Sequence, residues 1–412
     1  MSRAAKDFAK SSIRYDVMVA GHLCFDVIPR FIDSGVSRFD QIFRPGKLVL
    51  MGEATMSTGG PVSNTGIALK RLGNTVCFCA RVGDDEFGRL NVERLKQSGN
   101  AEGIRVVPGT ASSYTIVVAP PGIDRVFLHN PGTNNEFGAE DLSSDLIAAC
   151  RHFHFGYPPL MRRMYANEGR ELAAVFRLAK QAGATTSCDM ALPDPASASG
   201  QAPWRKILTA ILPDVDLFLP SVEESLYMID PDRFVAMKHE HRDADLIDYL
   251  TPEQYSGIAD QLLELGAKMV ALKSGHRGYY LKTKSARAFE SMGAARPGDP
   301  GNWSARELWC PAYAVTELAS ATGSGDSSIA GFLAAFLRGA AVEVALKFAT
   351  CLGWQNVQVP DAVSGIRSLA ETNELIAKKM PLIDAHIAAP GWTWHEELGV
   401  WAGPSDPLSR CP

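Results

Sequence analysis

Ala-Thr-Gly-Ser-Gly-Asp, residues 321–326, leads directly into a segment whose apolar side chains follow a helical period. Glycines let the backbone adopt positive φ and let a ligand approach closely, and the free N–H groups at a helix start favour an anion. The stretch therefore predicts an anion-holding turn that opens a buried helix. The helical period is carried by Ile329, Phe332, Leu333, Phe336 and Leu337.

Asp326 closes this turn, although its carboxylate would repel a bound anion. One interpretation gives it a chemical role, as the base that takes a proton from a hydroxyl attacking a phosphoryl group held by the turn. The other gives it a structural role, as an acidic residue in the first turn of a helix. The stretch alone leaves both open.

The composition of the whole chain limits the classes of protein that fit. The chain has 412 residues, 46% of them hydrophobic, which is enough for a large core. No apolar run approaches the ~20 residues needed to cross a bilayer, and the N-terminus lacks the apolar segment of a secretory signal, so we expect a cytoplasmic protein without membrane partners. A net charge of −5 without a long basic run argues against nucleic acid as a partner.

Expected strands and helices alternate from residue 143 onward, which is typical of βαβ units in a mainly parallel sheet. The Gly-, Pro- and Arg-rich stretch 284–309 does not fit this period, and we expect a surface excursion there. Strands are expected at 152–155, 185–189, 217–219, 269–273 and 312–315, and helices near 168–182, 203–212, 222–229 and 254–265.

The first part of the chain follows a different pattern. Extended pieces within about 24–58 and a hairpin within about 110–130 do not alternate with helices, which indicates a small β-sheet lid on the larger α/β body. The tail, 388–412, is rich in Trp and too apolar to remain free in solvent, so we expect it to pack on the body or on a second subunit.

Two groups of residues near the N-terminus could bind a substrate with hydroxyl groups. Asp26 follows the strand expected at 15–20, where ligands of open α/β sheets gather. Gly59 and Gly60 precede an amphipathic helix with Asn64 in its first turn, and an exposed amide can donate to hydroxyls and accept from them. Ordinary turn-forming roles explain the same residues equally well.

The Gly-Gly-x-x-Asn turn at 59–64, the segment Gly-Asp-Asp-x-Phe-Gly at 83–88 and Gly-Ser-Gly-Asp at 323–326 occur in this order and spacing. In these motifs the chain resembles the ribokinase-like (PfkB) carbohydrate kinase family from about residue 14 to 380. The resemblance implies a Rossmann-like three-layer α/β/α sandwich with a central, mainly parallel sheet and a small β-sheet lid. It also implies one kinase domain over 1–412, with 388–412 as a C-terminal extension.

The resemblance further implies transfer of the γ-phosphoryl of ATP, with Mg²⁺, to a hydroxyl of a small sugar or sugar derivative. By position in the motifs, Asp326 matches the catalytic base, and the backbone of Gly323, Ser324 and Gly325 matches the anion hole. The positions that match the acceptor site are Asp26, Gly59, Gly60 and Asn64, and those that match the ATP site are Ser221, Glu224, Ser274, Gly275, Gly278 and Asn356. Glu224 would hold Mg²⁺ through water.

Two departures from the family pattern bear on the site. Ser320 and Ala321 stand where the family often has Asp-Thr, and that aspartate commonly helps to bind a monovalent cation, so dependence on such a cation stays open. Met190 and Ala191 follow the strand that ends in Asp189, where an Asn and an Arg are frequent.

Two alternatives to a sugar kinase remain. The same fold accepts nucleosides, and an aromatic-lined pocket, for which Phe25 and Tyr157 are candidates, would favour a nucleoside kinase. A non-catalytic sensor of sugars or nucleotides would have no need of Asp326 as a base. The exposed lid sheet and the Trp-rich tail also suggest a homodimer.

Overall fold

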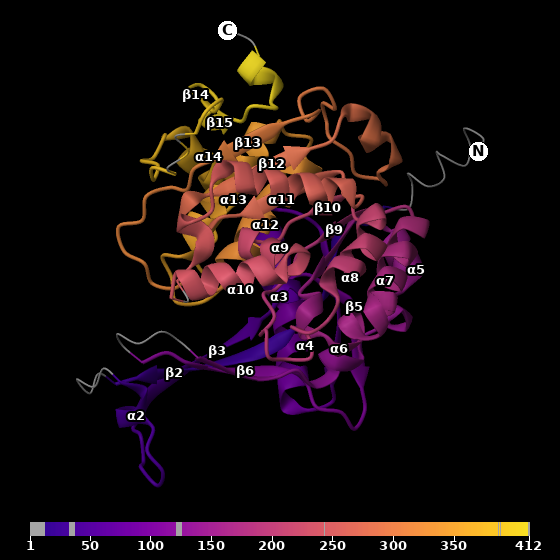
Figure 1. Ribbon diagram of the computed structural model, residues 1–412. Coiled ribbons are helices and arrows are strands. Elements are labelled where there is room, and N and C mark those ends of the chain that lie inside the picture. Colours follow the sequence, from indigo (N-terminus) through magenta and orange to yellow (C-terminus); the bar gives the residue numbers. More distant parts are fainter. Residues whose placement is uncertain are drawn as a thin grey trace.

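The main β-sheet forms the centre of the molecule (Figure 1). The computed structural model describes residues 13–32, 38–120, 126–242, 244–385, 387 and 389–410. The strands of the main sheet are β1 (Tyr15–Gly21), β4 (Val76–Gly83), β5 (Asn100–Val107), β8 (Cys150–Gly156), β9 (Thr185–Cys188), β10 (Leu217–Phe218), β11 (Met269–Lys273), β12 (Tyr279–Thr283), β13 (Glu307–Cys310), β14 (Thr393–His395) and β15 (Val400–Ala402).

The order of these 11 strands is β14-β15-β13-β12-β11-β10-β9-β8-β1-β4-β5. Neighbours from β11 to β5 are parallel, and those from β11 to β14 are antiparallel. Central strands such as β1 are buried along nearly their whole length, as expected where helices cover both faces of a sheet. The parallel strands end at one edge, which is where open α/β sheets bind ligands.

Helices cover both faces of this sheet and complete three layers, as the sequence predicted. One apolar core lies under α5 (Ser144–Ala148), α7 (Arg170–Gln181), α8 (Trp204–Ile211), α9 (Val222–Ile229) and α11 (Pro252–Glu264). The other lies under α3 (Pro61–Arg71), α4 (Glu86–Ser98), α12 (Ser324–Leu337) and α13 (Val342–Asn356). The remaining helices are α2 (Phe39–Ile42), α6 (Arg162–Tyr165), α10 (Pro231–Glu240) and α14 (Leu369–Ala377).

Helix α12 is enclosed along most of its length. It is apolar around most of its circumference and is buried from Asp326 to Leu337, as expected for a helix packed on all sides. It contacts α13 and α3. A side chain at its first turn is therefore held by packing on several sides.

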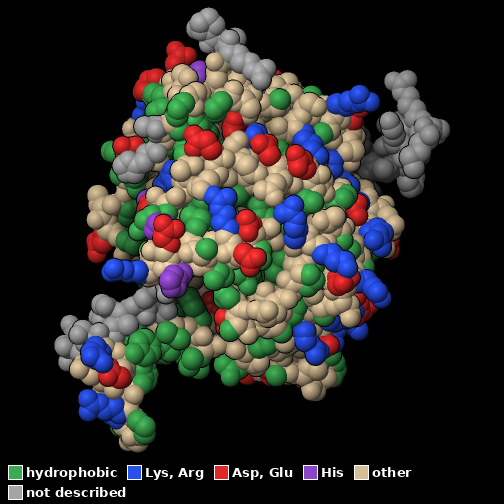
Figure 2. Space-filling model, viewed as in Figure 1, with side chains coloured by type: hydrophobic (Ala, Val, Ile, Leu, Met, Phe, Trp, Pro, Cys, Tyr) green, Lys and Arg blue, Asp and Glu red, His purple; other side chains and the backbone are tan. Residues whose placement is uncertain are grey.

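A second, small sheet lies beside the body, at the lower left of Figure 1. Its order is β3-β2-β6-β7, with β2 and β6 parallel and the other neighbours antiparallel. Apolar side chains of this sheet are exposed, among them Met56, Val126 and Leu128. Figure 2 shows hydrophobic side chains gathered in this part of the molecule. The four strands are β2 (Cys24–Phe31), β3 (Met51–Gly59), β6 (Tyr114–Val118) and β7 (Val126–Asn130).

The prediction of a strand at 312–315 is wrong. The strand in this region is β13 (Glu307–Cys310), which overlaps the stretch 284–309 that was expected to be a surface excursion. The sequence did not indicate this strand because charged residues, which are usually exposed, are buried in and beside it. Glu307 accepts a hydrogen bond from the Tyr280 hydroxyl at 2.9 Å, and Arg306 just before it forms an ion pair with Asp406 at 2.9 Å. The tail supplies this partner and the outer strands β14 and β15, so the last segment of the chain completes the edge of the main sheet.

Seven cysteines lie among the described residues, and all are buried and free. Within the same residues, no helix is long and apolar enough to span a bilayer.

Candidate active site

The glycine turn at 323–325 opens α12 as the sequence predicted. Gly323 precedes the helix with a left-handed φ of 76°, and a Cβ at this residue would lie 2.4 Å from the Cβ of Ala362, so only glycine fits. Ser324 donates its N–H to the carbonyl of Ala321 at 3.3 Å. N–H groups of a first turn have no acceptor within their own helix, and the helix dipole gives them a partial positive charge. The turn can therefore hold an anion.

Asp326 lies in this turn with its side chain buried. Its Oδ2 accepts two hydrogen bonds, from Nδ2 of Asn64 at 2.8 Å and from the hydroxyl of Tyr157 at 3.1 Å. Its Oδ1 is buried without a hydrogen-bond partner. One carboxylate oxygen is thus fixed by two donors, and the other is free to accept a proton or a hydroxyl hydrogen.

Burial raises the pKa of the Asp326 carboxyl above its ordinary value. The hydrogen bonds from Asn64 and Tyr157 and the nearby Lys273 ammonium oppose that rise, because each stabilises the ionised form. A carboxylate with a raised pKa is a stronger base than an exposed one.

Asp26, Gly59, Gly60 and Asn64 are linked to Asp326 through Asn64, which donates to its carboxylate from the helix that follows the two glycines. A Cβ on Gly59 would lie 2.2 Å from Oδ2 of Asp26, so a larger residue there would displace that carboxylate. Asp26 feels the charge of Asp326, and burial, followed by that charge, raises the pKa of Asp26. Oδ1 of Asn64 is buried without a partner. Several polar atoms here lack protein partners, as in a site that a ligand completes.

Two histidines that the sequence did not single out border this group. Nε2 of His22, which follows β1, lies 3.4 Å from Nε2 of His129 on β7. Nδ1 of His129 lies 3.0 Å from the Thr115 hydroxyl. Burial, and then the neighbouring His129, lowers the pKa of His22 to about 3, so it is neutral at pH 7. The two histidines connect the small sheet to the body. They are 107 positions apart in the sequence, so only the folded structure shows that they are in contact.

The predicted nucleotide residues divide between a cavity and its surroundings. Ser274, Gly275 and Gly278 line a cavity of about 460 Å³ between β11 and α12. Its lining is largely apolar and suits an aromatic base. Ser324, Gly325 and Lys273 also line it, and its apolar residues include Tyr313, Leu318, Trp354, Val357 and Ile383.

Ser221 and Glu224 lie outside the lining of this cavity. They form a capping box at the start of α9, in which the Ser221 N–H donates to Oε2 of Glu224 at 2.6 Å. Glu224 is joined to the cavity through Lys273, whose Nζ lies 3.8 Å from Oε2. Asn356 is also outside it: its Nδ2 donates to the carbonyl of Ala362 at 2.6 Å, below the glycine turn.

The arginine pair at 162–163 is engaged at the surface. Arg162 forms an ion pair with Glu136, and Arg163 forms ion pairs with Glu140 and Glu171. Both guanidinium groups are therefore already paired with carboxylates.

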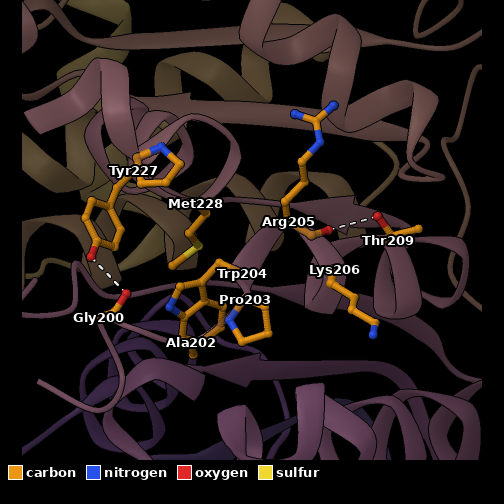
Figure 3. Close-up of a pocket in the computed structure, with 10 residues that line it drawn as sticks. Gly200, Ala202, Pro203, Trp204, Arg205, Lys206, Thr209, Tyr227 and Met228 are labelled. Carbon is orange, nitrogen blue, oxygen red and sulfur yellow. Dashed lines mark hydrogen bonds between the residues drawn. The ribbon is translucent and has the colours of Figure 1, made fainter. Parts of the chain in front are cut away.

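A separate hollow of about 540 Å³ lies at the start of α8 (Figure 3). Its polar groups already have protein partners: the Tyr227 hydroxyl donates to the Gly200 carbonyl at 3.0 Å, and the Thr209 hydroxyl to the Arg205 carbonyl at 2.8 Å. The hollow offers surface contact and no reactive group.

Solved structures share this fold. The structure of Arabidopsis thaliana ribokinase complexed with ribose and ATP aligns with a TM-score of 0.64 at 17% identity, over 88% of this chain and 99% of its own. The fructokinase with bound ATP from Xylella fastidiosa aligns with a TM-score of 0.65 at 17% identity, over 89% of this chain and 99% of its own. The fold is therefore ribokinase-like.

The sequence comparison identifies the family. The profile of the pfkB family of carbohydrate kinases matches residues 16–368, so the chain belongs to that family. A protein named "Probable fructokinase-4" from Arabidopsis thaliana is 30% identical over 216 residues, which cover 52% of this chain and 61% of that protein. A fructokinase of Solanum tuberosum is 32% identical over 172 residues, covering 41% of this chain and 49% of its own. The chain spans about half to three fifths of the length of these relatives.

Proposed function

We propose that this protein is an ATP-dependent kinase that phosphorylates a hydroxyl of a small sugar or sugar derivative. The observation that carries the proposal is the Asp326 carboxylate, with Oδ2 fixed by two donors and Oδ1 free and buried. A base held in this way accepts the proton of the attacking hydroxyl without reorganising. Membership of a carbohydrate kinase family supports the same reaction.

In this proposal the acceptor hydroxyl faces Oδ1 of Asp326 and attacks the γ-phosphorus in line with the leaving β-phosphate oxygen. The new bond joins the acceptor oxygen to phosphorus, the bond to the β-phosphate oxygen breaks with its electron pair, and the hydroxyl proton passes to Asp326. The N–H groups of the turn at 323–325 stabilise the charge on the transferred group. Asp26 and Asn64 bind other hydroxyls of the acceptor.

Mg²⁺ fits the residues beside the cavity only as an ion shared with phosphates and water. Among the described residues no cluster of three His, Cys, Asp or Glu side chains could hold a metal. Glu224 and the buried, unpartnered Oδ2 of Asp189 are the oxygens available to its water shell. Mg²⁺ commonly uses one or two carboxylates together with substrate phosphates and supplies neutralisation of phosphate charge. A protein of this fold from E. coli has been solved in complex with ATP and Mg²⁺.

A neutral sugar fits the acceptor side better than a phosphosugar, because Arg162 and Arg163 already pair with surface glutamates. A nucleoside is the second candidate. The rings of His22 and Tyr157 lie 6.2 Å apart on the acceptor side and could contact a base. Phe25 cannot, because it is fully buried and stacks on Phe87 at 5.5 Å.

The test combines a substrate panel with one substitution. Release of ADP from ATP is measured with sugars, phosphosugars and nucleosides as acceptors. With the best acceptor, Asp326→Asn should lower kcat by about 10²–10⁴-fold or more, because a positioned base is lost, while ATP binding measured by calorimetry persists. Undiminished turnover would remove the catalytic role of Asp326. A panel on which the wild-type protein releases no ADP above background would favour the non-catalytic sensor.

The expected homodimer and the cytoplasmic location remain predictions. The exposed apolar side chains of the small sheet support the first, since a second copy would cover them.

A further inference from the structure

Lys273 occupies a position at the active site that neither the motifs nor the proposed reaction uses. It ends β11, and its side chain lines the cavity of about 460 Å³. A Cβ built on Gly325 would lie 3.4 Å from Cδ of Lys273 and 3.6 Å from its Nζ. The ammonium therefore lies beside the first turn of α12, where the N–H groups favour an anion.

The charges around Lys273 fix it in place. Its Nζ forms an ion pair with Oδ1 of Asp189 at 2.5 Å and lies 3.8 Å from Oε2 of Glu224. Burial acts against the charge of Lys273, but Asp189 and Glu224 outweigh it and raise the pKa of Lys273 above its ordinary value. The side chain is thus a charged ammonium at neutral pH.

Among the described residues that line the cavity, Lys273 is the only Lys or Arg. Its ammonium lies beside the glycine turn, and apolar side chains such as Trp354 line the same cavity. A nucleotide with its base against the apolar side chains and its phosphates at the glycine turn would bring those phosphates to Lys273.

We propose that the Lys273 ammonium contacts the phosphoryl group being transferred, and that Asp189 is a positioning residue that holds the ammonium at the glycine turn. The inference rests on the proposed kinase function and adds a catalytic residue to it. Lys273 exchanges no proton in the step; its charge stabilises the equatorial oxygens of the phosphoryl group while the acceptor proton goes to Asp326. The alternative role is structural: Lys273 would serve only to neutralise the buried Asp189.

The substitution must separate these two roles. Lys273→Met alone leaves Asp189 buried and unpaired, which could unfold the protein. The informative variant is therefore Lys273→Met with Asp189→Asn, which removes both charges. Lys268→Met is the control. Lys268 directly precedes β11, at the opposite end of this strand from Lys273, and pairs with the buried Asp216 at 2.7 Å.

Two measurements are made on variants whose thermal unfolding shows a folded protein. With the best acceptor, the double variant should lose about 10²–10³-fold in kcat with a smaller change in the KM of the acceptor, as when a donor to a developing charge is removed. The Lys268→Met variant should keep the wild-type kcat. An unchanged kcat in the folded double variant overturns the proposal.

The second measurement needs no acceptor. Calorimetry with Mg²⁺ present compares the binding of ATP and ADP, which differ by the phosphoryl group at issue. The double variant should bind ATP at least tenfold more weakly, with a clearly smaller change for ADP. Equal weakening of both nucleotides overturns the proposal. If the wild-type protein phosphorylates no acceptor, the proposed function fails, and this comparison still decides whether Lys273 contacts the terminal phosphate.

Discussion

The substitution Tyr157→Phe tests how the pKa of Asp326, the proposed base, is set. The Tyr157 hydroxyl donates to Oδ2 of Asp326 at 3.1 Å, and Tyr157 adopts a left-handed φ of 62° after β8. A tyrosine in that conformation costs about 1–2 kcal/mol, so the fold maintains strain to bring the hydroxyl to the carboxylate. The substitution removes one oxygen atom and keeps the ring.

The magnitude follows from the hydrogen bond. A hydrogen bond to a charged group contributes about 1.5–3 kcal/mol, and about 1.4 kcal/mol corresponds to one pH unit. The donor stabilises the ionised form of Asp326, so its loss raises the pKa of that carboxyl. Since the base acts when ionised, the acid limb of the pH profile of kcat/KM should move to higher pH by about one unit or more.

The assay is the rate of ADP release with the best acceptor, measured as kcat/KM from acid to neutral pH. Tyr227→Phe is the control, because the Tyr227 hydroxyl donates to the Gly200 carbonyl at 3.0 Å, away from the site. Its acid limb should match that of the wild-type protein. An acid limb that stays in place in Tyr157→Phe, or moves to lower pH, would refute the role given to this hydroxyl.

Two further predictions concern stability. Gly323→Ala should lower the free energy of unfolding by about 1–2 kcal/mol or more, because it places a Cβ on a left-handed residue within 2.4 Å of Ala362. Gly257→Ala, with open space around its Cβ, is the control and should be neutral or slightly stabilising. Urea denaturation measures both, and a Gly323→Ala variant as stable as the wild type would contradict the prediction. Burial holds the pKa of His154 well below its ordinary value, so the unfolded chain binds a proton there that the folded chain does not. Of the stability lost as the pH falls from 6.5 to 5, this histidine should contribute about 2 kcal/mol, in addition to the contributions of the buried His22 and His152. His154→Asn should reduce that loss by about the same amount, and an equally steep fall in its stability between these pH values would show that this histidine does not titrate on unfolding.

The parts of the fold that the sequence predicted correctly are those with a local signal. The alternation after residue 143 indicated the parallel sheet, and glycines before apolar helices indicated both turns of the site. The contact of Asn64 with Asp326 joins residues 262 positions apart, and only the order of the family motifs suggested it. Neither secondary-structure propensity nor hydrophobic periodicity predicts a contact between residues so far apart in the sequence.

The failures have a physical cause in common. Strand β13 contains Glu307, whose buried carboxylate accepts hydrogen bonds from Ser405 in the tail, so neither the polarity of the strand nor its neighbours in sequence indicated a buried strand. Tyr157 follows β8 and Lys273 ends β11, and neither has a local pattern that marks it. Their roles depend on which strand ends lie side by side, and that is set by the sheet order.

The charge balance at the strand ends connects these observations. Asp189, Glu224 and Asp326 are three carboxylates that influence one another, and Lys273 is the ammonium that all of them share. Excess negative charge in a buried site disfavours the ionised form of each carboxylate. It therefore raises the basicity of Asp326, and it would also repel a polyphosphate. In the proposed reaction, the arrangement that raises the basicity of Asp326 therefore requires additional positive charge when the nucleotide binds, which the N–H groups of α12 and a cation carried with the phosphates would supply.

Ser320 fits this balance. Its hydroxyl accepts the N–H of Thr322 at 3.1 Å, as a carboxylate oxygen would, without adding a further negative charge near the proposed phosphate site.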